Sequence, residues 1–103
     1  MKTIKFETML TAKDVEGLRD AVEGAIKGES FAIEYKPGLS VCWHIEKIAR
    51  ELNLNVLDTY LYPGDKLSDY DIPKNTLVVV GREAKGDGEE YYIVHQLEVF
   101  YNR

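Results

Sequence analysis

The stretch SFAIEYKPGLSVCWHIE, residues 30–46, holds a strand, a turn and the start of a helix in one continuous run. Apolar residues alternate with other residues from position 31 to 35, which is typical of a strand, and Pro37-Gly38 ends it. Ser40 suits the N-cap of a helix that we expect to run through roughly residue 53. The stretch therefore predicts a strand–turn–helix joint, a unit on which α/β domains are built.

Further strand and helix patterns lie on both sides of this joint. Upstream, residues 2–8 alternate as in a strand, and Thr11 with Asp14 predicts the start of a helix that ends near Gly28. Downstream, three more strands are predicted, at NVLDTYLY (55–62), TLVVVG (76–81) and YYIVHQLEVFY (91–101). The continuous β-branched run in TLVVVG is typical of a strand that is covered on both faces.

These patterns predict the fold class. The order β-α-β-α-β-β-β indicates an α+β two-layer sandwich, in which two helices pack on a mixed sheet of about five strands. The glycine-containing stretch REAKGDGEE, residues 82–90, is typical of a hairpin connection, so we expect the C-terminal half to be antiparallel and to end in a C-terminal antiparallel hairpin. The length of 103 residues predicts a single α/β domain over residues 1–103.

Charge and composition narrow the classes of partner. The formal net charge of −5 is opposite to the basic balance that binding to a phosphate backbone needs, so we expect no nucleic-acid partner. The single cysteine, Cys42, leaves no internal disulfide and fits a reducing compartment. No apolar run has the length of a membrane span or the pattern of a signal peptide. We therefore expect a soluble, cytoplasmic protein with no membrane partner.

The joint at residues 36–44 is a candidate phosphate site, because nucleotide-binding proteins hold phosphate where a strand turns into a helix. Such a loop needs several glycines, a lysine, and a serine or threonine at fixed spacing. Only Gly38 is present, and Val-Cys-Trp occupies positions 41–43, where the lysine and the hydroxyl are wanted. A degenerate nucleotide- or anion-binding domain that uses Ser40 and the helix N-terminus stays open as an alternative.

The sequence offers no constellation for catalysis or for a metal ion. Cys42 and His44 stand two residues apart in the predicted helix, so they point to different faces, and Cys42 fits a small buried hydrophobe better than a nucleophile. His95 lies in the last predicted strand without ligand spacing to another metal-binding residue. The acidic turn with Asp65 and Asp69 lacks the calcium-loop pattern. We expect no enzyme activity, no catalytic residue, no cofactor and no metal.

Trp43 is the leading candidate for contact with a partner. At roughly 100° per residue it lies about 160–180° from the centre of the apolar stripe of the predicted helix, on the face with Glu46, Lys47 and Arg50. Two arrangements stay open: the indole folds back on the preceding loop, or it is exposed to solvent. An exposed tryptophan with arginine and tyrosine nearby is typical of a binding hot spot.

A second group of candidate contact residues surrounds the acidic turn at 60–71. It consists of Tyr60, Tyr62, Asp69 and Tyr70. Tyrosine gives a large contact area at a low cost in side-chain entropy, although strand propensity also explains several of the chain's tyrosines. Together with the helix face of Trp43, these residues make up the predicted partner-binding surface.

Two partial family resemblances add to these expectations. The segments AIEYKPGLSVCWHIEKI and LSDYDIPKNTLVVVGR, within residues 32–82, resemble the ubiquitin-like β-grasp pattern: a strand that ends in a Pro turn, a central helix, and a Leu-Ser-Asp-Tyr-x-Ile turn before the final strand. This resemblance implies a β-grasp-like binding module and not a conjugated modifier.

The other resemblance covers AVEGAIKGESFAIEYKPGLSVCWHIEKIARELNLNVLDTYL, residues 21–61, which is similar to the N-terminal part of an AAA-type ATPase domain. Helix, strand, Pro-Gly loop, helix and second strand follow in the same order. The Walker lysine and hydroxyl are replaced, and no acidic pair follows TLVVV. This resemblance implies a nucleotide-binding scaffold without its nucleotide site, and neither resemblance implies catalysis.

The features favour a small non-enzymatic protein-binding module, which acts as an adaptor or as an inhibitor of a protein partner. The anion-binding domain described above is one alternative. A homo-oligomeric structural protein is another, in which a homodimer forms through the C-terminal strand at 91–101. Such a long, alternating strand can pair with a second copy if its edge is uncovered.

Overall fold

Two helices and five strands make up the described part of the chain. The computed structural model describes residues 2–6, 9–36, 39–62, 64–85 and 93–103, with the side chains of 83–85 and 93–95 left out. In chain order the elements are β1 (Lys2–Phe6), α1 (Ala12–Ile26), β2 (Phe31–Tyr35), α2 (Val41–Glu51), β3 (Asn55–Tyr60), the 3-10 helix η1 (Leu67–Asp69), β4 (Thr76–Lys85) and β5 (Ile93–Asn102). The predicted α+β class and element order are confirmed.

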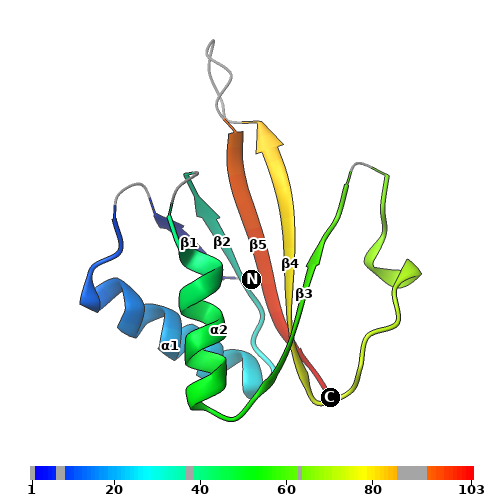
Figure 1. Cartoon of the computed structure of the whole chain (residues 1–103), viewed down its shortest axis with the longest axis horizontal. Helices are drawn as coiled ribbons and strands as arrows, with labels where there is room; N and C mark the ends of the chain where they lie inside the picture. The colour runs from blue at the N-terminus through cyan, green and yellow to red at the C-terminus, as the bar shows by residue number, and fades with distance from the viewer. Residues whose placement is uncertain (1, 7–8, 37–38, 63, 86–92) are drawn as a thin grey trace.

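The five strands form one mixed sheet in the order β1-β2-β5-β4-β3 (Figure 1). β1 is parallel to β2, and β3 is parallel to β4. β5 is antiparallel to both of its neighbours, β2 and β4. The predicted antiparallel pair at the C-terminus is therefore confirmed, while its connection at residues 86–92 lies outside the described residues.

The prediction that the whole C-terminal half is antiparallel is wrong for β3. β3 runs parallel to β4, with Asn55 opposite Thr76 and Tyr60 opposite Gly81. Parallel neighbours need a crossover connection of about a dozen residues or more, and residues 61–75 supply one. The turn formers in this segment signal an interruption of the strands, but they do not reveal that the chain crosses back along the sheet.

The position of β5 bears on the edge through which a homodimer was expected to form. β5 lies in the middle of the sheet, paired with β4 along residues 93–102 and with β2 along residues 95–99. The outer strands of the sheet are β1 and β3. Because a second copy adds to a strand with unpaired backbone groups on one side, residues 95–99 of β5 offer no edge for such pairing, and the homodimer stays a prediction.

A capping box fixes the start of α1. The Thr11 hydroxyl accepts a hydrogen bond from the Asp14 backbone N–H at 3.2 Å, and the Asp14 carboxylate accepts one from the Thr11 backbone N–H at 2.9 Å. Gly28, just beyond the helix, has a φ of +103°, a conformation that favours glycine. Both predicted ends of α1 are confirmed.

Both helices cover the same face of the sheet and enclose the main core there (Figure 1). From the helices this core takes Leu18, Val22, Ala25, Val41, Ile45, Ile48 and Ala49, and from the sheet Phe31, Ile33, Leu77, Val79, Leu97 and Val99. The predicted apolar stripe of α2 is thus the face that packs on the sheet. α2 ends at Glu51, slightly earlier than expected, and Asn53 adopts a left-handed φ of +57°.

β4 is covered on both faces, as its continuous apolar sequence predicts. Leu77 and Val79 belong to the main core under the helices. Val78 and Val80 point the other way and pack with Leu61 in a second cluster. Leu67 and Ile72 of the crossover segment add to that cluster. None of the helices in the described ranges is long and apolar enough to cross a membrane.

The strand directions bring several chain ends to one edge of the sheet. Because β5 is antiparallel to β2 and to β4, the other four strands all run in one direction (Figure 1). The carboxyl ends of β2 and β3, Tyr35 and Tyr60, therefore lie at the same edge, where α2 begins. In open sheets of this kind, ligands bind at the carboxyl ends of the strands.

Candidate functional site

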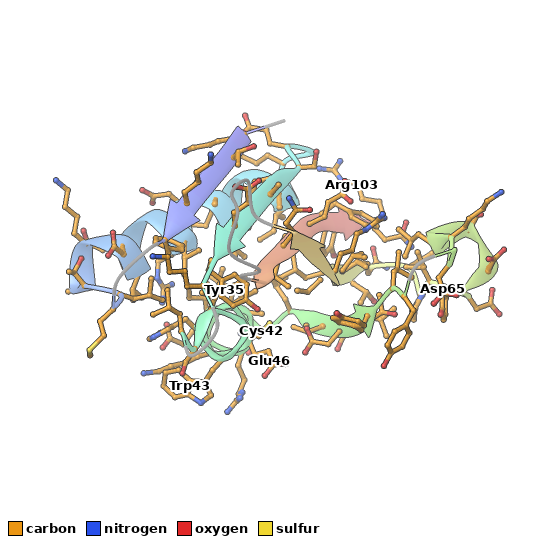
Figure 2. The ribbon with its side chains drawn as sticks, turned by 90° about the horizontal axis from the view of Figure 1, so that it is seen from above. Tyr35, Cys42, Trp43, Glu46, Asp65 and Arg103 are labelled. Carbon is orange, nitrogen blue, oxygen red and sulfur yellow. The ribbon has the colours of Figure 1, made fainter. Side chains whose placement is uncertain are left out.

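The outer face of α2 carries an exposed aromatic and cationic stripe. It consists of Trp43, Lys47 and Arg50, which succeed one another along the helix at spacings of four and three residues and are all exposed. We call this set the Trp43 stripe. Trp43 is 54% exposed, which decides between the two arrangements left open by the sequence in favour of an indole in solvent. Figure 2 shows its ring projecting away from the sheet.

Neighbouring side chains of α2 hold the Trp43 ring in place. The Lys47 ammonium lies 5.2 Å from the centre of the indole, within the range of a cation–π contact. The His44 ring meets the indole edge-on, with ring centres 4.9 Å apart. The indole is therefore positioned by its own helix while one face remains open to a partner.

The Tyr–Asp group predicted around residues 60–71 lies elsewhere. Tyr62 is 66% exposed and Tyr70 is 44% exposed, while Tyr60 is partly buried, with its ring centre 5.0 Å from that of Tyr62. Asp69 is exposed, and its carboxylate accepts a hydrogen bond from the Lys66 backbone N–H.

The structure does not bring this group to the Trp43 stripe. Trp43 and Asp65, which belongs to the same acidic turn as the tyrosines, lie at opposite ends of the molecule in Figure 2. The Asp65 carboxylate accepts a hydrogen bond from the Tyr62 backbone N–H at 3.0 Å and so stabilises the turn. The surface predicted as one patch is thus two separate patches.

A cavity of about 420 Å³, which the sequence analysis missed, opens between α2 and β3 above the sheet. We call it the α2–β3 pocket. It is lined by Tyr35, Cys42, Asp58, Thr59, Tyr60, Val79, Gly81, Arg82, Gln96 and Leu97. It lies at the carboxyl ends of β2 and β3, where the strand directions favour a ligand site. Its volume falls in the range of about 300–1,000 Å³ that is usual for small-molecule sites.

Gly81 helps to create this pocket. A Cβ atom at position 81 would lie 3.2 Å from the ring of Tyr60 and 3.5 Å from a methyl group of Leu97. The first distance is tighter than ordinary van der Waals contact, so a side chain at position 81 would displace the ring or fill the floor of the cavity. Glycine inside a strand often marks such a close approach.

Asp58 is the most perturbed carboxyl group at the pocket. Partial burial, followed by a hydrogen bond with Glu46 and repulsion by its charge, raises the pKa of Asp58 to about 7. Both residues face the space between α2 and β3, one from each element. Asp58 therefore changes its charge in the physiological pH range, a property that occurs often at functional sites.

Cys42 and Tyr35 form the wall nearest the start of α2. The Tyr35 hydroxyl and the Cys42 sulfur lie 3.9 Å apart, and Figure 2 shows the two side chains next to each other, with Glu46 close by. Burial raises the pKa of both groups, and the nearby carboxylates of Asp58 and Glu46 raise that of Cys42 further. The thiol is therefore held in its protonated form, which opposes a nucleophilic role.

The remaining sequence candidates gain no ligand in this arrangement. Ser40 occupies the N-cap of α2 as predicted, but its side chain makes no capping hydrogen bond, and residues 37–38 lie outside the described residues. His44 packs on Trp43 and not on Cys42. The side chain of His95 is not described. Within the described ranges, no group of three or more potential metal ligands comes together.

Comparison with known proteins gives no relative for this chain. No family model, no curated protein and no solved structure matches it. Neither the ubiquitin-like nor the ATPase resemblance gains support from these searches, and the function has to be inferred from the site itself.

Proposed function

We propose that this protein binds another protein through the Trp43 stripe and acts as an adaptor or inhibitor. The observation that carries the proposal is the 54% exposure of the chain's only tryptophan on the solvent face of a helix whose opposite face is fully packed. Large apolar side chains with this degree of exposure are enriched in binding hot spots, tryptophan most of all.

The stripe is also organised in advance for binding. The Lys47 ammonium over the indole and the edge of His44 restrict the motion of the ring, so little side-chain entropy is lost when a partner covers it. α2 itself is anchored by its buried stripe and by an ion pair between Arg19 of α1 and Glu51. A rigid helix that presents one aromatic anchor suits insertion into a groove on the partner.

Charge indicates the chemistry of the partner surface. Lys47 and Arg50 make the stripe locally basic, although the whole chain carries a net charge of −5. A fitting partner offers an apolar cleft for the indole with carboxylates on its rim, since complementary charge at the rim steers association. The protein's overall negative charge would then keep it from binding acidic surfaces without specificity. We place this interaction in the cytoplasm, as the composition predicts.

Capture from the source cell, followed by measurement with the purified partner, tests the proposal. Trp43→Ala should weaken binding by at least about tenfold, because removal of a hot-spot residue costs roughly 2 kcal/mol or more. Met9→Ala is the control: Met9 is a large apolar side chain that is 83% exposed, and it lies outside both groups of candidate contact residues. Equal affinities of the wild-type protein and Trp43→Ala, with both folded, would refute the proposal.

A further inference from the structure

The α2–β3 pocket has a polar mouth and an apolar floor. Asp58 is exposed at the mouth and lies within hydrogen-bonding reach of Glu46 on the facing helix. The floor consists of Val79, Gly81 and Leu97, and the two side chains among them are buried in the main core. A ligand in this cavity would therefore place an apolar part against the sheet and a polar part between two carboxyl groups.

Two tyrosines, Tyr35 at the end of β2 and Tyr60 at the end of β3, line the walls between mouth and floor. Aromatic rings beside carboxylates form a suitable environment for organic cations, because ring faces attract positive charge and the carboxylates accept its hydrogen bonds. The site differs from the Trp43 stripe, because Trp43, Lys47 and Arg50 are not among the residues that line the pocket.

We propose that the α2–β3 pocket binds a small organic cation, an amine carried on an apolar body, with Asp58 and Glu46 as its counter-ions and Tyr35 and Tyr60 beside its stem. The charged head lies at the mouth between the two carboxyl groups. The apolar body rests on the floor formed by Val79 and Leu97, beside Gly81, where the absence of a side chain lets the Tyr60 ring approach the strand closely.

Other classes of ligand fit the pocket less well. Arg82 also lines the pocket, but it follows Gly81 in β4, so its side chain points to the other face of the sheet. An anion would therefore meet the negative charge of Asp58, with Glu46 beside it, and a neutral molecule would leave that charge unpaired. A bare metal ion needs six or more oxygen ligands or a tight cluster of His, Cys and carboxylate side chains, and no such cluster occurs among the described residues. An amine, by contrast, neutralises the pair and also uses the apolar floor.

The electrostatics of the mouth support this choice. Partial burial, and after it the neighbouring Glu46, raise the pKa of Asp58 to about 7, so its charged form carries a penalty at neutral pH. A cation placed beside Asp58 offsets that penalty, so its binding should release a proton from Asp58. Proton release therefore distinguishes this mode of binding from adsorption of an amine on the exposed acidic surface.

The test compares matched probes on the full chain by protein NMR titration and calorimetry. The probes are benzylamine, 2-phenylethylamine and cyclohexylamine, each paired with the alcohol of the same carbon frame, and 3-phenylpropionate as the anion. We expect at least one amine to bind about tenfold more tightly than its alcohol, with chemical-shift changes centred on residues 58–60 and 79–81, and we expect 3-phenylpropionate not to bind. Calorimetry in two buffers of different ionisation enthalpy should show proton release near neutral pH.

Carboxyl variants make the test specific to the pocket. The double variant Asp58→Asn/Glu46→Gln should lose the preference for the amine, whereas Glu16→Gln, which removes an exposed carboxylate from α1, should retain it. Preserved dispersion of the NMR spectrum verifies that each variant is folded. The proposal is overturned if no amine exceeds its alcohol, if the shifts map elsewhere, or if the double variant keeps the preference.

Discussion

At the scale of single residues, three positions show what a sequence can and cannot reveal. The angular position of Trp43 on a helical wheel puts it away from the core, because helix geometry is regular, but only the structure decides that the indole is exposed and not folded on the preceding loop. Asp58 and Gly81 gave no comparable signal. In the sequence, each is an ordinary departure from a strand pattern. The role of Asp58 depends on Glu46 and that of Gly81 on Tyr60, and these residues come close only after folding.

Asp58 should make stability depend on pH in an unusual direction. Folding raises its pKa from 3.8 to about 7, so between these values the folded state holds a proton that the unfolded chain has released. The stability contributed by this group is thus present at low pH and is lost as pH rises toward 7. Asp58→Asn should have a higher melting temperature than the wild type at about pH 8, and this difference should disappear near about pH 4.

Asp20→Asn supplies the control for this measurement, because Asp20 is an exposed carboxyl group on α1. The difference in melting temperature between Asp20→Asn and the wild type should vary little between the two pH values. A stability difference for Asp58→Asn that does not depend on pH would show that burial and Glu46 do not hold the proton on this group.

Cys42 should react slowly with thiol reagents. Burial and the nearby carboxylates raise the pKa of its thiol, which lowers the fraction of thiolate, the reactive form, at neutral pH. We expect the folded protein to react with a disulfide reagent at least about tenfold more slowly than a free cysteine at pH 7, and at the ordinary rate in denaturant. Reaction of the folded protein faster than free cysteine would indicate an activated nucleophile instead.

At the scale of elements, the local patterns were reliable where neighbouring residues alone determine the structure. Thr11 with Asp14 and the glycine at position 28 mark both ends of α1, since capping depends on residues a few positions apart. The parallel pairing of β3 with β4 was not predicted, because the pairing of strands depends on the path of residues 61–75 across the sheet. The alternation of apolar and polar residues in β5 likewise does not reveal its central position, because strand order also depends on the path of the chain.

The two helix starts provide a matched pair of variants. The Thr11 side chain makes a capping hydrogen bond, whereas that of Ser40 makes none. Thr11→Ala should lower the free energy of unfolding by about 1 kcal/mol. Ser40→Ala should change it by less than about 0.5 kcal/mol. Chemical denaturation measures both, and equal losses would contradict the difference between the two caps.

At the scale of the whole molecule, the sheet topology determines which surfaces remain for function. The helices cover one face, the crossover segment covers the other face of β4, and β5 is enclosed between two neighbours (Figure 1). Among the surfaces that this arrangement leaves accessible are the solvent face of α2 and the α2–β3 pocket. The candidate contact residues of α2 could be predicted from sequence, but the pocket is lined by residues of five elements, α2, β2, β3, β4 and β5, and could not.

The central place of β5 should be visible in hydrogen exchange. Its residues 95–99 pair with strands on both sides, so their amides should exchange only when most of the fold opens. These amides should therefore be the slowest to exchange. Amides of the outer strands β1 and β3 should exchange faster. If residues 95–99 exchanged as fast as β1, the strand order described here would be wrong.

The central claim is that Trp43 is free in solution and buried in a complex, and its single occurrence in the chain makes it directly measurable. The chain labelled with 5-fluorotryptophan gives one fluorine NMR signal, and the partner stays unlabelled. In the free protein this signal should respond to a soluble paramagnetic quencher as an exposed indole does, and the captured partner should shift it and protect it. A signal already protected in the free protein, or unchanged when the partner is saturating, would contradict the account.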